Sequence, residues 1–378
     1  MVRTVSSERA RERILVFRIG QLGDMIVGLP AMRAIRERWP NAYITLLCDM
    51  HFGEKYVLGN EIFRNAGLFD SFELYVVPNK SAGFIAGLFT RLSLLLRLRR
   101  QKFTKLFYLA PTLRSQEQIN RDRRFFRAAG LEEFHGMEDF PEVPQKKAGT
   151  PLASLGPEAD LLLARLTKSG ITIPASNRGS LDLGLNEEDN AAVDRWLTSL
   201  PSDNGRRWIG VGPTSKMPAK RWPIERFREV VQLLIEQYDL WPVVFGGAED
   251  NLIAAQLLES WGRGYNAAGS LGVRAAAAAL ARCDLYLGND SGTMHLAACA
   301  QIPCVAIFSS RDWPGAWYPY NVEARVFRSD IECEGCYLVE CIERQNECLK
   351  RISVQQVLSA CRELLAKTSA ENKLSVIS

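Results

Sequence analysis

The sequence has no long apolar run of the kind that forms a secretory leader or a membrane-spanning helix. It also has no simple repeat and no low-complexity tract. Its excess charge is small, because 47 Lys and Arg stand against 43 Asp and Glu, a net charge of +4. We therefore expect a cytoplasmic protein that needs no nucleic-acid partner. A mildly basic chain still suits an anionic ligand or an anionic membrane surface.

The composition is that of a soluble globular protein, with 47% hydrophobic and 24% charged residues. A chain of 378 residues is long enough for two domains with a core in each. Nine cysteines without a leader favour reduced thiols or a metal site over a disulfide framework. Residues 1–13 are polar and basic, and we expect a disordered segment there.

Apolar runs alternate with amphipathic segments along both halves of the chain. Strands are predicted at 14–20, 42–49, 72–77 and 105–110, and again at 208–213, 241–247, 284–290 and 303–309. The intervening segments have helical spacing. This order predicts an α/β fold of two Rossmann-like domains with parallel sheets and a ligand cleft between them.

Composition also suggests where the domains meet. Residues 141–180 and 199–206 are rich in Pro, Gly, Ser and Asn, so we place a linker near 175–205. We expect the first domain over 14–180, the second over 206–350, and a C-terminal helix and tail over 351–378.

The segment DLYLGNDSGTMHLAA, residues 284–298, runs from a buried strand through a small-residue turn into a helix. Free N–H groups at Ser291, Gly292, Thr293 and Met294 would point at an anion, aided by the helix dipole. A helix simply capped by Asp290 or Ser291 is the alternative.

A second segment, GPTSKMPAKRWPIERF at 212–227, follows a predicted strand with clustered hydroxyl and cationic groups. Thr214, Ser215, Lys220 and Arg221 suit a diphosphate, although a Lys-Arg pair alone is more often a solvated loop.

A third segment, RIGQLGDMIVGLP at 18–30, has GxxGD where a dinucleotide fold would have GxGxxG. Asp24 stands at the start of a helix, where it would act as a base facing an acceptor hydroxyl or as a helix cap.

Together these segments resemble the heptosyltransferases of glycosyltransferase family 9, which have the GT-B fold and build the lipopolysaccharide inner core. The resemblance rests on residues 14–47, 213–227, 245–251 (FGGAEDN) and 284–298, which occur in the family's order. It implies a metal-independent inverting transferase that uses an ADP-heptose donor. The first domain would bind the acceptor, which is a lipopolysaccharide core or another glycan, lipid-linked or protein acceptor, and the second would bind the donor.

The resemblance also implies roles for single residues. Asp24 would be the general base of one in-line displacement. The diphosphate and sugar would be held by Thr214, Ser215, Lys220, Asp290, Ser291, Gly292, Thr293 and His295. Asp250 would hold the ribose, a role that the adjacent Glu249 could also fill. The phosphate loop departs from the family, which more often has glycine and alanine before the serine.

Two features leave alternatives open. Cys333, Cys336, Cys341 and Cys348 form either a structural Zn or Fe site or a set of reduced surface thiols. Residues 83–103 form an apolar helix with a basic end, either a solvated terminus over a core face or a membrane-surface helix at the inner face of the membrane; we favour the first.

Two further functions fit the same architecture. A nucleotide-sugar epimerase would act on the donor without an acceptor. A non-catalytic nucleotide-sugar-binding protein would bind the donor without turnover. Asp24, Lys220 and Asp290 favour the transferase over the non-catalytic protein.

Overall fold

The computed structural model describes residues 11–51, 57–77, 83–172 and 179–377, which form two compact units. The first unit comprises Met1–Gly20, Pro30–Pro141 and Leu161–Arg178, and the second comprises Gln21–Leu29, Glu142–Asp160 and Gly179–Ser378. Two segments of the expected first domain, Gln21–Leu29 and Glu142–Asp160, therefore pack with the second unit. Most of the segment expected to be disordered lies outside the described residues, and Arg13 already belongs to a strand.

The first unit contains a five-stranded parallel sheet in the order β3-β2-β1-β4-β5. Its strands are β1 (Arg13–Phe17), β2 (Tyr43–His51), β3 (Ser71–Val77), β4 (Lys105–Tyr108) and β5 (Glu133–His135). Its helices are α2 (Leu29–Arg38), α3 (Gly59–Phe63), α4 (Gly83–Gln101), α5 (Gln116–Ala128) and most of α6 (Glu158–Lys168). The apolar side chains of β1 and β4 form one core with those of α4 and α5.

The second unit contains a six-stranded parallel sheet in the order β11-β10-β9-β6-β7-β8. Its strands are β6 (Trp208–Gly212), β7 (Trp241–Val244), β8 (Tyr265–Asn266), β9 (Cys283–Asn289), β10 (Cys304–Ile307) and β11 (Ala324–Phe327). Its helices are α1 (Leu22–Val27), α7 (Glu187–Leu197), α8 (Ile224–Tyr238), α9 (Asn251–Trp261), α10 (Val273–Leu280), α11 (Gly292–Cys299), α12 (Glu347–Lys350) and α13 (Val354–Ile377).

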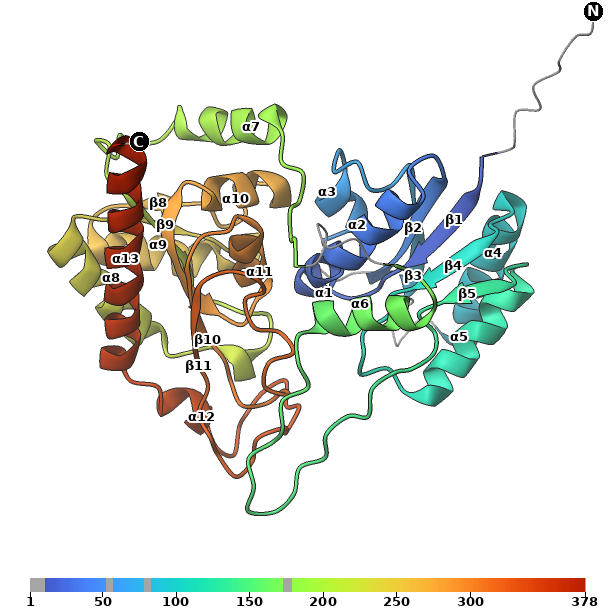
Figure 1. Cartoon of the computed structure of the whole chain (residues 1–378). Coiled ribbons are helices and arrows are strands. Elements are labelled where there is room, and N and C mark those ends of the chain that lie inside the picture. Colours follow the sequence, from blue (N-terminus) through green and yellow to red (C-terminus); the bar gives the residue numbers. More distant parts are fainter. Residues whose placement is uncertain (1–10, 52–56, 78–82, 173–178, 378) are drawn as a thin grey trace, which may run out of the picture. The chain divides into compact units, whose positions relative to one another are not determined.

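Each sheet is flanked by helices, as Figure 1 shows. The central strands are apolar on both faces, because a parallel sheet is covered on both sides. Ile209 and Leu285, for example, are completely buried among the side chains of α8 and α13. The predicted α/β class with two Rossmann-like parallel sheets is confirmed.

The stretch expected to be a linker, 175–205, contains a regular helix. Asn186 caps α7 by accepting hydrogen bonds from the backbone N–H groups of Glu188 (3.0 Å) and Asp189 (3.2 Å). Arg274 of α10 then holds Asp189 with two hydrogen bonds, of 3.0 and 2.6 Å. A cap and a buried ion pair thus fix residues 186–197 in the second unit, while residues 175–178 of the predicted linker lie outside the described residues.

In the part of the chain that the structure describes, no helix combines the length and the hydropathy needed to cross a membrane.

Candidate functional site

The candidate site lies in the second unit, at the carboxyl ends of the adjacent strands β6, β9 and β10. This is the edge of a parallel sheet at which ligands commonly bind. Asn289, the last residue of β9, is buried and joins two of the loops there. Its Oδ1 accepts from the N–H of Trp222 (3.0 Å), and its Nδ2 donates to the carbonyl of Pro213 (2.8 Å). The amide thus fixes both ends of the loop that carries Thr214, Ser215 and Lys220.

Lys220 ends a short 3-10 helix, η3 (Pro218–Lys220), and faces two carboxylates. Its Nζ lies 2.6 Å from Oδ2 of Asp290 and 3.6 Å from Oδ2 of Asp312. Burial by itself lowers the pKa of Lys220, but the charges of Asp290 and Asp312 outweigh it and the pKa is raised. The ammonium group therefore stays charged at neutral pH at the edge where β9 ends.

The hydroxyl groups of the turn after β9 form a chain that ends on a buried tyrosine. Ser291 Oγ lies 2.9 Å from Oγ1 of Thr293, which lies 2.7 Å from the hydroxyl of Tyr286. A Cβ on Gly212 or Gly288 would collide with that phenol, so only glycine leaves room for Tyr286 between the strands. This network fixes the start of α11, where backbone N–H groups have no partner within the helix.

Thr214 and Ser215 are the other two predicted residues of this loop. Thr214 is buried, and Ser215 Oγ donates to the carbonyl oxygen of Asp290 (3.4 Å). The structure thus brings together Ser215, Lys220 and Asp290, as the sequence predicted.

His295 lies on α11 and is completely enclosed. A Cβ on Gly23 of α1 would come within 2.6 Å of Cδ2 of the His295 ring, and one on Gly292 would come within 2.8 Å of Leu22. Two glycines therefore allow α1 to pack directly on α11. Burial, and then the charge of Lys220, lower the pKa of His295 to about 3, so the ring is neutral. Among the described residues, its Nδ1 has no hydrogen-bond partner.

Asp24 is the third residue of α1, and its Oδ2 accepts from the backbone N–H of Gln21 (2.9 Å). The capping interaction considered from the sequence is therefore present. Asp24 therefore belongs to α1, the helix that packs on α11 and covers His295.

Asp250 follows β7, the strand on the side of β6 away from β9. Its Oδ2 accepts from the N–H of Gly247 (2.8 Å) at the start of η4 (Ala248–Asp250). Asp250 therefore follows a strand that is two positions away in the sheet from β9, the strand that leads to Asp290.

Sequence reasoning missed the loop after β10. Asp312 faces Lys220 and accepts a hydrogen bond from Arg311 (2.6 Å), and both side chains are buried. The sequence did contain a signal for Asp312, because this residue follows a predicted strand. The carboxyl ends of neighbouring parallel strands meet at one edge of the sheet, so a residue there can reach the same site.

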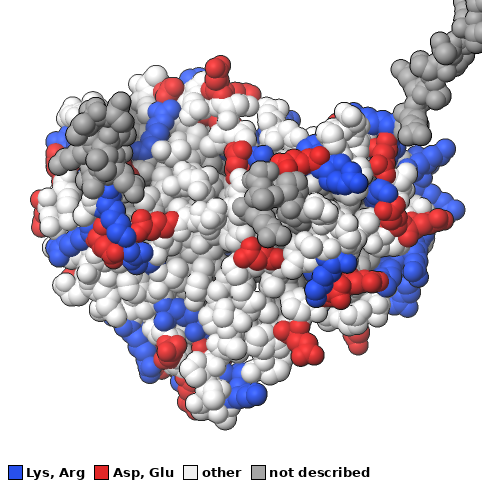
Figure 2. Space-filling view, in the orientation of Figure 1, with Lys and Arg blue, Asp and Glu red and all other residues white. Residues whose placement is uncertain are grey.

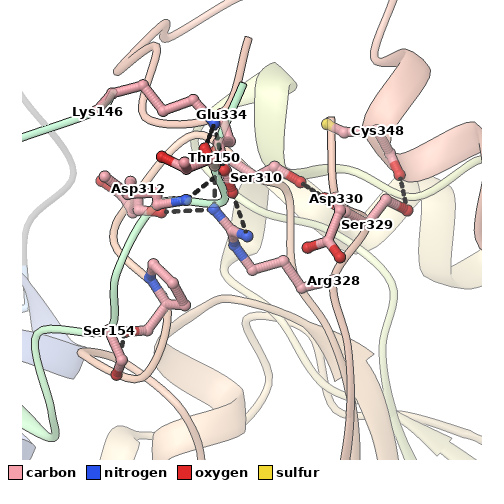
Figure 3. Close-up of polar contacts among 12 residues, drawn as sticks. Lys146, Thr150, Ser154, Ser310, Asp312, Arg328, Ser329, Asp330, Glu334 and Cys348 are labelled. Atoms are coloured by element: carbon pink, nitrogen blue, oxygen red, sulfur yellow. Dashed lines mark hydrogen bonds and ion pairs between the residues drawn. The ribbon is translucent and has the colours of Figure 1, made fainter. Parts of the chain in front are cut away.

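The buried carboxylate of Glu334 is linked through Arg328 to the loop that carries Asp312 (Figure 3). Arg328 donates to Glu334 (2.8 Å) and to the carbonyl oxygens of Ser310 (3.4 Å) and Asp312 (3.3 Å). Glu334 also accepts from Lys146 Nζ (2.5 Å) and from the N–H of Leu152. Burial by itself raises the pKa of Glu334, but these hydrogen bonds outweigh it and the pKa is lowered. Glu334 thus fastens residues 142–155, which we call the strap, to the loop that holds Asp312.

The four predicted metal ligands Cys333, Cys336, Cys341 and Cys348 line one cavity of about 340 Å³. As the described side chains are placed, no group of three or more His, Cys, Asp or Glu residues is arranged to hold a metal ion. All nine cysteines are free thiols.

In the first unit, a smaller cavity of about 160 Å³ lies among residues of β1, β2, β3, α4 and α5. Its apolar lining includes Phe17 and Leu47, and its charged lining consists of Arg91, Arg114, Arg121 and Asp122, which forms ion pairs with Arg114 and Arg121. An apolar lining with several cations suits a molecule that has both an apolar part and an anionic group.

Comparison with known proteins agrees with this geometry. Residues 174–347 match glycosyltransferase family 9 (heptosyltransferase). Lipopolysaccharide heptosyltransferase 2 of Escherichia coli K12 is 32% identical over 181 residues, 46% of this chain and 50% of that protein. Lipooligosaccharide heptosyltransferase 2 of Campylobacter jejuni is 28% identical over 166 residues, 43% of this chain and 52% of that protein. The chain thus spans about half the length of the curated relatives it matches.

Solved structures share the fold along nearly the whole chain. A glycosyl transferase family 9 protein from Veillonella parvula has a TM-score of 0.68 and 23% identity, covering 94% of this chain and 97% of that one. The ADP-heptose lps heptosyltransferase II of E. coli has a TM-score of 0.64 and 22% identity, covering 94% and 99%. The iron-containing dodecameric glycosyltransferase TibC from enterotoxigenic E. coli has a TM-score of 0.51 and 14% identity, covering 94% and 77%. The two parallel α/β units have the GT-B fold of these structures, and residues 174–347 carry the match to glycosyltransferase family 9.

Proposed function

We propose that this protein is an inverting glycosyltransferase that transfers a heptose from ADP-heptose to a lipopolysaccharide core or to another glycan or protein acceptor. The observation that carries the proposal is the buried, charged Lys220, held beside the first turn of α11 at the carboxyl ends of β6, β9 and β10. A cation next to a helix N-terminus is a site for a diphosphate. The heptose and the adenine are inferred from the match to the heptosyltransferase family and from the ADP-heptose that the similar E. coli enzyme uses.

The proposed donor contacts follow from this placement. Lys220 and the N–H groups of residues 291–294 stabilise the departing diphosphate, while Thr214, Ser215 and Ser291 supply hydroxyl groups. Asp250 or Glu249 holds the ribose. The neutral His295 packs under this turn, where it adds no charge of its own to the site.

The proposed chemistry is one in-line displacement at the anomeric carbon. Asp24 accepts the proton of the acceptor hydroxyl as the new glycosidic bond forms and the bond to the diphosphate breaks. In this proposal the leaving group is stabilised by Lys220 and the backbone, so no catalytic metal takes part.

The acceptor is proposed to bind the first unit, at the cavity lined by Arg91, Arg114 and Arg121. The lining has three cations against one carboxylate, Asp122, and this net positive charge favours an acceptor with an anionic group. Nine free thiols are the pattern of a reducing compartment, which supports a cytoplasmic protein. Contact with the inner face of the membrane is a further part of the proposal.

We further propose one structural metal at Cys333, Cys336, Cys341 and Cys348. The shared cavity supports it, as does the iron-containing relative TibC, although the thiols would have to turn toward one another to bind. Elemental analysis of protein purified without added metal tests this proposal. About one Zn or Fe per chain is expected, and only trace metal would favour free thiols.

The proposed donor site is tested by calorimetric titration with ADP, using Lys220→Met and, as the control, Lys216→Met on the exposed lysine of the same loop. Losing a charge-assisted contact costs about 1.5–3 kcal/mol, so Lys220→Met should bind ADP roughly tenfold or more weakly. The control should bind as the wild type does. Equal affinity of all three proteins would refute the assignment.

Transfer itself is tested by incubating the protein with ADP-heptose and a truncated lipopolysaccharide core. A product heavier by one heptose is expected. Conversion of the donor sugar without an acceptor would instead indicate an epimerase, and ADP binding without any turnover would indicate a non-catalytic binding protein.

A further inference from the structure

Helix α4 of the first unit has two apolar faces, of which only one packs against the protein. Leu94 and Leu98 are buried in the core. The opposite face carries Leu88, Phe89, Leu92 and Leu96, which are 58, 72, 52 and 45% exposed. Their spacing of three to four residues aligns them along the helix. We call these four side chains the apolar ridge. Single exposed apolar residues are ordinary, but a contiguous row of four large ones marks an interaction surface.

The ridge is surrounded by cations. Arg91, Arg99, Arg100 and Lys102 are exposed, and no described acidic side chain pairs with them. Residues 83–130, which include α4 and the neighbouring α5, contain eleven Lys and Arg against two acidic residues, Glu117 and Asp122. Asp122 is already bound by Arg114. Figure 2 shows Lys and Arg side chains gathered at the right-hand edge of the molecule, where Figure 1 places α4 and α5.

We propose that the outer face of α4 is the docking surface for a lipid bilayer with anionic headgroups. A helix lying flat on such a bilayer buries its apolar ridge below the headgroups, while its long Arg and Lys side chains reach the phosphates. Each cation near an anionic leaflet adds to the attraction, and the effect falls off within a Debye length. Four of the nineteen residues of α4 are arginines, which is too much charge for a helix that spans a membrane, so we propose that it lies on the surface.

A second copy of the chain fits this surface less well. In a two-fold dimer the same patch faces itself, so the cations around one ridge would meet those of the other. With no acidic residue on α4 to offset them, this contact would be repulsive. Anionic lipid satisfies both the apolar and the charged part of the surface.

This proposal assigns a surface to the membrane contact of the proposed function, and it rests on that function for the reason why the protein would bind a membrane. Arg91 belongs both to the exposed face of α4 and to the lining of the first unit's cavity. Docking through α4 would therefore hold the proposed acceptor cavity next to the lipid surface, where a lipid-linked acceptor is found.

The test is co-sedimentation of the full chain with vesicles of phosphatidylcholine alone, or of phosphatidylcholine and phosphatidylglycerol in equal parts. Phe89→Ser is compared with Leu252→Ser, which removes a side chain of similar exposure, 69%, from α9 of the second unit. Arg100→Glu is compared with Arg228→Glu, on an exposed residue of α8. All variants change exposed positions, and a melting curve verifies that each is folded. Neither donor nor acceptor is present, so failure of this proposal is separate from failure of the transferase proposal.

We expect the wild type to bind the anionic vesicles and not the neutral ones, and to be released by high salt. Phe89→Ser and Arg100→Glu should each weaken binding roughly tenfold, because each removes an anchoring contact, while both controls bind as the wild type does. Equal binding by all five proteins, or no binding by the wild type, would overturn the proposal. A concentration-dependent dimer that Phe89→Ser abolishes, without vesicle binding, would assign the ridge to a second copy and also overturn it.

Discussion

At the scale of single residues, Asp24 has two roles that substitution can separate. Its carboxylate caps α1 through the N–H of Gln21, and we propose that it also accepts the acceptor's proton. Asp24→Asn keeps a side-chain oxygen for the cap but cannot accept a proton. We expect the melting temperature and the affinity for ADP to stay near the wild-type values, while turnover falls by ~10²-fold or more.

The measurement is sugar transfer by Asp24→Asn, with a melting curve and an ADP titration on the same preparation. Asp24→Ala, which removes the cap as well, should also lose roughly 1 kcal/mol of unfolding free energy. Near-normal transfer by Asp24→Asn would leave Asp24 as a cap alone.

His295 gives the second unit a pH dependence of known sign. Its pKa is lowered from 6.5 to about 3 by burial and by the charge of Lys220. The unfolded chain therefore binds a proton that the folded chain does not bind until far lower pH. The stability that the neutral ring provides is complete above pH 6.5 and is lost as the pH falls from 6.5 toward 3.

Urea unfolding at about pH 7 and about pH 4.5 tests this effect. The wild type should lose roughly 2 kcal/mol more than His295→Gln does between these two values, on the basis of 1.4 kcal/mol for each pH unit. His135→Gln, on a ring of the first unit that is 15% exposed, is the control. If the wild type and His295→Gln lose the same amount, the ring is not the source.

At the scale of helices and strands, prediction succeeded where the local pattern is strong. The runs that became β1, β6 and β9 are mostly apolar and buried, because both faces of a parallel sheet are covered. Strands β5, β8 and β11 were not predicted, and each of them has two to four residues and lies at the edge of its sheet. Such short edge strands are defined by the strand they pair with, which a local pattern does not show.

Helix α7 was missed for a related reason. This helix is polar on most of its surface. It is held in the second unit largely by the buried ion pair between Arg274 and Asp189, which lie 85 residues apart in the sequence. Loss of one partner leaves a buried charge uncompensated. We expect Asp189→Ala to lower the free energy of unfolding by about 3–5 kcal/mol, since Arg274 remains buried.

The matched control is Asp194→Ala on the same helix. Asp194 forms an ion pair with Arg282 (2.8 Å), but its side chain is 65% exposed, so its loss should cost at most about 1 kcal/mol. Denaturant unfolding measures both values. Similar losses in the two variants would mean that the Arg274–Asp189 pair does not hold α7 in place.

At the scale of the whole molecule, the site could be predicted only in part. Asp290, Ser291 and Lys220 belong to segments for which the sequence offered anion binding as one of two interpretations, and the structure brings them to one sheet edge. Asp312 belongs to no such segment, and its place opposite Lys220 follows only from the order of β6, β9 and β10 in the sheet. The packing of α1 on α11 was equally hidden, because it depends on two glycines, Gly23 and Gly292, that are far apart in sequence.

Glu334 connects the strap to the loop that carries Asp312, and its side chain is only 1% exposed. Its replacement should therefore loosen two segments that are more than 150 residues apart in the sequence. In Glu334→Ala, Lys146 loses the carboxylate that holds it, and Arg328 keeps only carbonyl partners. We expect trypsin to cleave the strap after Lys146 or Lys147 at least about tenfold faster than in the wild type, because cleavage needs a locally released chain.

The rate is measured by limited proteolysis, and mass spectrometry identifies the cut. Glu332→Ala is the control, because Glu332 is a nearby carboxylate with a side chain that is 88% exposed and only a long contact to Arg344 (3.5 Å). Affinity for ADP is measured on the same samples. If Glu334 positions the loop of Asp312, ADP binding should weaken together with the faster cleavage, whereas the control changes neither. Faster cleavage with unchanged ADP binding would show that Glu334 fastens the strap alone, and an unchanged cleavage rate would show that other contacts are enough to hold it.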